Sequence, residues 1–121
     1  MIPHTWDPHH RDDDGELIGY VASFGDAFTA YTLFGYPLAD GVDQFDAEQA
    51  LESAGLRYLA ERWLLTVADR TEPLAVEIVE VTPGAVTVKH VDYGDDDRWG
   101  TLYTLDVPVE PTTLRPARAL S

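Results

Sequence analysis

One segment of the sequence has, more clearly than the rest, the spacing of apolar residues that an α-helix needs. Across residues 46–55, apolar side chains recur at i, i+3, i+4 and i+7, which places them on one face of a helix. Asp46 followed by Gln49 fits a capping box, and Gly55 suits the left-handed residue that closes a helix. The residues on the apolar face are Ala47, Ala50, Leu51 and Ala54. Because alanine dominates this face, we expect the helix to lie close against a sheet.

The rest of the chain consists of short β-type runs separated by turn residues. The predicted strands are residues 16–23, 27–34, 63–68, 74–82, 85–91 and 99–107. Pro83-Gly84 predicts a two-residue type II turn between two of them. The order β-β-α-β-β-β-β predicts an α+β fold with one principal helix and about six mostly antiparallel strands. We expect a bent sheet or a small, partly open barrel, and the last four strands alone would suffice for an SH3-like barrel.

The length of 121 residues fits one domain. Residues 1–15 contain two prolines, three histidines and a run of aspartates, without a hydrophobic period. We therefore expect residues 1–15 to form a flexible arm and residues 16–121 to form a single α+β domain.

Charge restricts the partners. The chain has 22 acidic and 8 basic residues, a formal net charge of −14. Nucleic acids and anionic membranes are bound through clustered Lys and Arg, whereas Lys89 is the one lysine and the arginines are spread singly. We expect no nucleic-acid partner and no membrane partner. Such acidity suits solubility or a cationic partner.

Familiar catalytic motifs are missing from the sequence. There is no cysteine, no glycine-rich phosphate loop and no His-Glu-x-x-His. These absences argue against the common enzyme classes, and we expect no cofactor. The lack of cysteine, of a signal-peptide pattern and of a long apolar run makes the cytoplasm the expected location.

The candidate catalytic residues are His90 and Glu77. Counting outward from the turn at residues 83–84 places Val81 opposite Val86 and Glu77 opposite His90. A Glu–His pair beside valines could serve as an acid–base pair or a ligand clamp. The plainer interpretation, which we prefer, is a polar cross-strand pair at the edge of a sheet.

Two aromatic loops are candidates for partner binding. The loop at residues 92–99 places carboxylates beside aromatic rings, an arrangement that could hold a cationic ligand. Its candidate residues are Asp92, Tyr93, Asp95, Asp96, Asp97 and Trp99. Tyr36, between Gly35 and Pro37, could contact a partner from a second loop. The alternative is a solvated hairpin loop anchored by Trp99, with the second cluster packed in the core.

The N-terminal segment holds the candidate metal ligands. They are His9, His10, Asp12 and Asp14, within a longer run of His and Asp residues. Imidazole and carboxylate are suitable ligands for a divalent metal. The spacing matches no standard site, so a polar arm without metal is the preferred interpretation.

Three runs resemble short acidic proteins of high-GC bacteria. They are Gly-Glu-Leu-Ile-Gly-Tyr at residues 15–20, Thr-Leu-Phe-Gly-Tyr-Pro-Leu at 32–38 and Gly-Leu-Arg-Tyr-Leu-Ala at 55–60. The resemblance implies no activity, cofactor or partner.

Three functions remain open from the sequence. The leading one is a small acidic binding module that recognises a protein or other cationic partner, with a homodimer as one form. The second is a small enzyme or ligand-binding protein that uses His90, Glu77 and the 92–99 loop. The third is an acidic inhibitor that mimics nucleic acid. A deep pocket at His90 would favour the second function.

Overall fold

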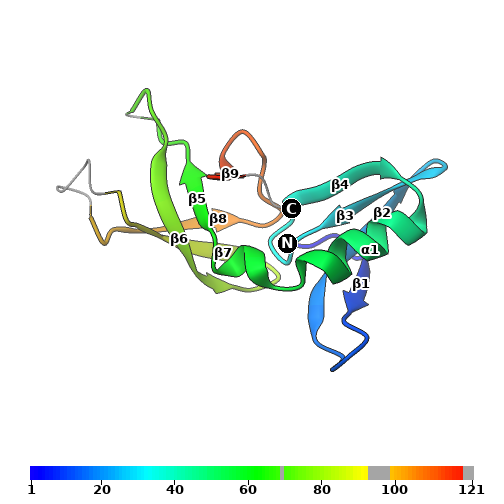
Figure 1. Ribbon diagram of the computed structural model, residues 1–121. Coiled ribbons are helices and arrows are strands. Elements are labelled where there is room, and N and C mark those ends of the chain that lie inside the picture. The colour runs from blue at the N-terminus through cyan, green and yellow to red at the C-terminus, as the bar shows by residue number, and fades with distance from the viewer. Residues whose placement is uncertain (69, 93–98, 119–121) are drawn as a thin grey trace.

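Two antiparallel sheets lie side by side in the computed structural model, which describes residues 1–68, 70–92 and 99–118 (Figure 1). The N-terminal sheet contains, in this order across it, β1 (Asp7–His10), β2 (Leu17–Phe24), β3 (Ala27–Tyr31) and β4 (Pro37–Val42). The C-terminal sheet contains, in order, β8 (Leu102–Asp106), β7 (Ala85–His90), β6 (Leu74–Val81), β5 (Arg62–Leu65) and β9 (Leu114–Pro116). Helix α1 (Gln44–Ala54) and a short 3-10 helix, η1 (Arg57–Leu59), connect the sheets.

The α+β class with one principal helix is confirmed. The predictions of a single bent sheet and of a partly open barrel were wrong. The strands divide into two sheets, and neither sheet closes into a barrel. No helix within the described residues is long and apolar enough to cross a membrane.

The segment expected to be a flexible arm contains β1. Asp7 lies opposite Val21 and Pro8 opposite Tyr20, so β1 forms the outer strand of the N-terminal sheet. An edge strand tolerates proline, since one side of its backbone needs no partner. Trp6, just before β1, stacks on Tyr31 with ring centroids 3.8 Å apart. The prediction of a flexible arm was therefore wrong for this part of the chain.

Helix α1 packs on the N-terminal sheet through its small apolar face. Ala47 and Leu51 are fully buried and belong to one core cluster with Ile18 and Ala30. This contact needs glycine at position 19. A β-carbon there would lie 2.3 Å from the Tyr31 carbonyl oxygen and 2.6 Å from Leu51 Cδ2. The mostly alanine face of the helix thus does lie close against a sheet.

The N-cap of α1 is Asp43, which lies three residues before the predicted cap. Its carboxylate accepts a hydrogen bond from the Asp46 N–H at 2.7 Å. Asp46 is the third residue of the helix, so its predicted role as cap was wrong. Gly55 closes the helix as predicted, with φ of 55° and its N–H donating to the Leu51 carbonyl at 2.8 Å.

An aromatic cluster joins the two sheets. Tyr58, in η1, donates its hydroxyl to the Ile18 carbonyl at 2.8 Å and accepts the Leu33 N–H at 3.1 Å. Trp63 Nε1 donates to the Tyr58 carbonyl at 2.9 Å. The ring of Phe34 lies edge-on to Trp63 at 5.0 Å. These contacts tie the inner face of the C-terminal sheet to the end of β3.

A β-bulge changes the register between β6 and β7. Val81 lies opposite Val86, as the two-residue turn predicts, but the pairing shifts between Ile78 and Glu80. Val79 is the extra residue of the bulge, and 54% of its surface is exposed. The turn itself is not of type II, because Gly84 lacks the left-handed φ that this type requires.

Candidate functional site

The structure separates the predicted catalytic pair. Beyond the bulge, Val76 lies opposite His90, and Glu77 lies opposite Lys89. His90 is fully buried, whereas Glu77 is exposed and lies 3.5 Å from Arg62. The predicted pairing of His90 with Glu77 was therefore wrong. The bulge keeps Val76 in the core and turns the carboxylate of Glu77 toward solvent.

The ring of His90 is buried and forms a hydrogen bond with the backbone. Its Nδ1 accepts a hydrogen bond from the Asp92 N–H at 3.1 Å, which places the proton of a neutral imidazole on Nε2. Nε2 is buried and has no hydrogen-bond partner among the described residues. His90 thus fixes the chain as it leaves β7.

The candidate metal ligands make other contacts. His9 Nε2 lies 3.9 Å from Glu52 Oε1 on α1, and the Asp12 N–H donates to the same oxygen at 3.0 Å. Asp14 forms an ion pair with Arg11 at 2.9 Å, and this hydrogen bond lowers the pKa of Asp14 to about 2. His10 is exposed on β1. Within the described ranges, no three His, Asp or Glu residues gather as a metal site.

The aromatic candidates lie in different settings. Tyr36 is half-buried, with its ring edge-on to Trp63 at 5.1 Å. Trp99 is 48% exposed, and Lys89 Nζ lies 5.2 Å from the centre of its ring. Trp99 therefore does not anchor its loop in the core. Asp92 is half-buried next to His90. Tyr93, Asp95, Asp96 and Asp97 lie outside the described residues.

The free edge of β8 is a candidate site that the sequence analysis missed. Val107 N–H donates to the Gly84 carbonyl, and His90 N–H donates to the Thr101 carbonyl. Hydrogen-bonded positions alternate along an antiparallel pair. The peptide groups of β8 that point away from β7 are therefore those of Leu102, Thr104 and Asp106. No described strand pairs with this side of β8.

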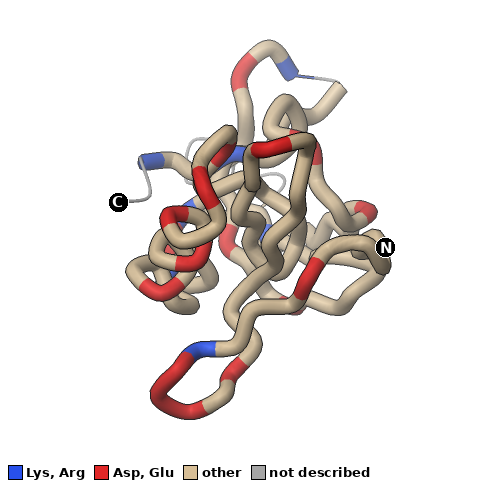
Figure 2. The backbone as a smooth tube through the Cα atoms, turned by 90° about the vertical axis from the view of Figure 1, so that its right-hand side faces the viewer, with Lys and Arg blue, Asp and Glu red and all other residues tan. Residues whose placement is uncertain are grey.

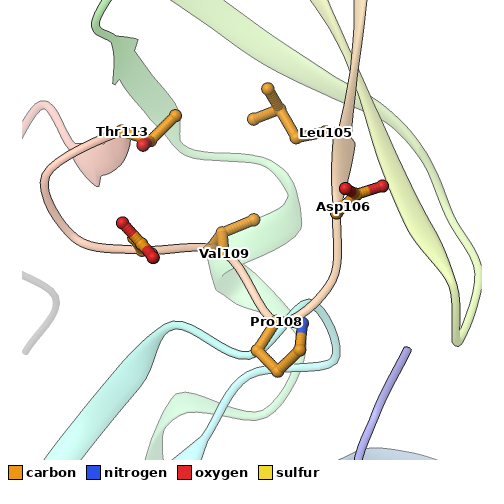
Figure 3. A pocket seen from close by; sticks show the side chains of 6 residues that line it. Leu105, Asp106, Pro108, Val109 and Thr113 are labelled. Carbon is orange, nitrogen blue, oxygen red and sulfur yellow. The ribbon is translucent and has the colours of Figure 1, made fainter.

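A hollow of about 210 Å³ lies between β8 and the segment that follows it (Figure 3). Its lining residues are Leu105, Asp106, Pro108, Val109, Glu110 and Thr113. Leu105, Val109 and Thr113 face the same space, so its interior is mainly apolar (Figure 3). We call the hollow and the outward edge of β8 together the β8 groove.

The segment that follows β8, which forms the other wall of the β8 groove, is held by hydrogen bonds and packing. Val109 N–H donates to the Phe34 carbonyl at 2.9 Å, and Thr113 N–H donates to the Glu110 carbonyl at 2.9 Å. Pro108 packs on Gly35, where a β-carbon would lie 2.4 Å from Pro108 Cβ. Because these contacts link the wall to the aromatic cluster, the hollow belongs to the folded core rather than to a loose loop.

The β8 groove carries negative charge. Asp106 and Glu110 are exposed carboxylates on its rim, and no basic residue lines the hollow. Elsewhere, acidic residues occur throughout the described chain, with few basic ones between them (Figure 2). A positively charged group would therefore meet a favourable field at the groove.

The sequence does contain signals for this site. The alternation of Tyr103, Leu105 and Val107 identified the strand, but strand order across a sheet cannot be read from one strand. The three prolines of the next segment, Pro108, Pro111 and Pro116, favour an extended tail rather than the wall of a site. The apolar Val109 beside the acidic Glu110 in that segment was the available clue.

Comparisons with protein families, with curated proteins and with solved structures find no match.

Proposed function

We propose that this protein is an acidic interaction module that binds a basic segment of a partner protein. The observation that carries the proposal is the β8 groove, in which an apolar hollow, two exposed carboxylates and an open strand edge lie together. Apolar contact would supply affinity, and the carboxylates would select positive charge.

The overall charge supports the same partner class. A net charge of −14 attracts cationic proteins and repels polyanions. Such attraction raises the rate of association and weakens as salt is added.

The enzyme alternative has lost its acid–base pair, since His90 is enclosed opposite Val76 and Glu77 faces solvent. Nucleic-acid mimicry calls for carboxylates along one face, whereas the acidic residues of this chain are spread over many segments (Figure 2). The β8 groove is the more specific feature.

Fluorescence anisotropy with labelled peptides tests the proposal. The probe is a peptide of about eight residues with alternating lysine and valine, and its counterpart replaces lysine with glutamate. We expect the lysine peptide to bind and its affinity to fall with salt, while the glutamate peptide does not bind. Equal binding of both peptides, or binding of neither, would contradict the proposal.

Matched double variants locate the binding site. Asp106→Asn with Glu110→Gln removes the two carboxylates of the groove, and we expect binding of the lysine peptide to weaken about fivefold. Asp13→Asn with Asp26→Asn removes the same charge from two exposed positions of the N-terminal half and should have a much smaller effect. Equal losses in the two double variants would show non-specific attraction and overturn the site.

A further inference from the structure

We infer that the basic segment binds as an added strand on β8, with one of its apolar side chains in the hollow. This inference rests on the proposed function and specifies how the partner is held.

Of the four described strands that form sheet edges, β8 differs from the other three because it contains no proline. Proline lies within β1, β4 and β9, at Pro8, Pro37 and Pro116. Proline lacks an N–H and is one of the means by which proteins prevent pairing at an exposed edge. β8, with the sequence Leu-Tyr-Thr-Leu-Asp, contains neither proline nor a bulge in its pairing with β7. It is thus the described edge best suited to receive another strand.

The outward peptide groups define the backbone contacts of the added strand. Leu102, Thr104 and Asp106 would exchange hydrogen bonds with it, since their N–H and C=O groups point away from β7. Leu102 is 59% exposed and lies at the start of this edge. Strand addition would cover Leu102 and would also give the outward N–H and C=O groups of β8 hydrogen-bond partners.

Side chains of the added strand would alternate between two environments. Those on the inner side would lie beside Leu105 and enter the hollow toward Val109 and Thr113. Those on the outer side would remain in solvent, beside the side chains of Thr104 and Asp106. The expected segment therefore alternates apolar residues with basic ones, the basic residues being favoured by Asp106 and Glu110.

Peptide order and backbone methylation test strand addition directly. A peptide with the same lysines and valines in two separate blocks should bind at least about tenfold more weakly than the alternating peptide, since only alternation fits both faces. N-methylation of either all lysines or all valines removes one alternate set of N–H groups. We expect one methylated peptide to lose binding and the other to retain it, because only one set faces β8. Loss in both, or in neither, would overturn strand addition.

Substitution of Thr104 tests the same contact from the protein side. Its N–H points away from β7, so Thr104→Pro removes an edge donor while leaving the existing pairing in place. We expect it to weaken binding of the alternating peptide about tenfold. Thr104→Val retains the N–H and should bind like the unmodified protein. Circular dichroism checks that both variants are folded, and a third variant, Thr113→Leu, which fills the hollow, should also lose binding.

The outcomes separate the inference from the proposed function. If the lysine peptides bind through Asp106 and Glu110 but respond neither to order, to methylation nor to Thr104→Pro, the module binds basic partners without strand addition. If light scattering shows a dimer that Thr104→Pro dissociates, a second copy of the chain occupies the edge and the inference is wrong.

Discussion

Tyr58 determines how the two halves of the chain fit together. Its side chain is buried, and its hydroxyl contacts the Ile18 carbonyl and the Leu33 N–H, two backbone groups of the N-terminal half. Buried backbone groups that lose a partner are costly, so a single hydroxyl has a large effect on stability here.

We predict that Tyr58→Phe lowers the free energy of unfolding by about 1–3 kcal/mol, because it leaves a half-buried N–H and a buried C=O without this partner. Urea unfolding followed by circular dichroism measures the loss. Tyr103→Phe, at a half-buried tyrosine of β8, is the control and should cost less. A near-neutral Tyr58→Phe would show that the hydroxyl contacts do not stabilise the junction.

The same residue predicts a dependence on alkaline pH. Burial raises the pKa of Tyr58 above its ordinary value. The unfolded chain loses the phenolic proton near pH 10, roughly the ordinary tyrosine pKa, while the folded chain keeps it. Stability is therefore fully present below about pH 10 and declines as the pH rises through that value. The decline should be shallower in Tyr58→Phe; an identical decline would contradict the assignment.

At the scale of elements, proline decided which of the edge strands were missed, since β8 also lies at an edge, lacks proline and was predicted. The predicted strands near residues 17–24, 74–81 and 85–90 are central or paired through short turns. The three strands that were not predicted, β1, β4 and β9, all contain proline and lie at sheet edges. Proline lowers the expectation of a strand, but an edge position removes the conflict.

For α1 we predict that Asp43→Ala costs about 1 kcal/mol of stability, because it removes the side-chain cap. Asp46→Ala should cost less, since Asp46 contributes only a favourable charge in the first turn. Chemical denaturation of the two variants gives the comparison. A larger loss in Asp46→Ala would place the cap where the sequence pattern predicted it.

The bulge at Val79 leads to a prediction about coupling. Glu77 and Lys89 are cross-strand neighbours, so their double-mutant cycle should show a coupling energy of about 0.2–1 kcal/mol. Glu77→Gln and His90→Gln should be additive, because the bulge puts their side chains on opposite faces. Clear coupling between Glu77 and His90 would instead support the register that was predicted without a bulge.

At the scale of the whole molecule, charge opposes the compact fold. With a net charge of −14, the folded chain holds many carboxylates at close range, and their repulsion lowers its stability. Salt screens such repulsion between exposed groups.

We therefore predict that raising NaCl from about 20 mM to about 200 mM increases the melting temperature by a few degrees. Differential scanning calorimetry measures the shift. Asp13→Asn with Asp26→Asn should reduce the salt dependence. A melting temperature that is constant or falls with salt would show that ion pairs such as Arg11–Asp14 outweigh the repulsion.

The sequence by itself determined the features that depend on neighbouring residues. These are the β2–β3 hairpin, the apolar face and glycine end of α1, the two-residue turn between β6 and β7, and the acidic charge. Each is set by turn geometry, by helical spacing or by composition, which act over a few residues.

Only the tertiary structure decided which strands form edges, where β6 bulges and what surrounds His90. These depend on contacts between segments far apart in the chain. Glu77 faces solvent because Val76 and Ile78 pack inward, and no local rule at the turn records that preference. The β8 groove arises in the same way, since Pro108 packs on Gly35 and holds Val109 beside a strand whose outer side has no described partner.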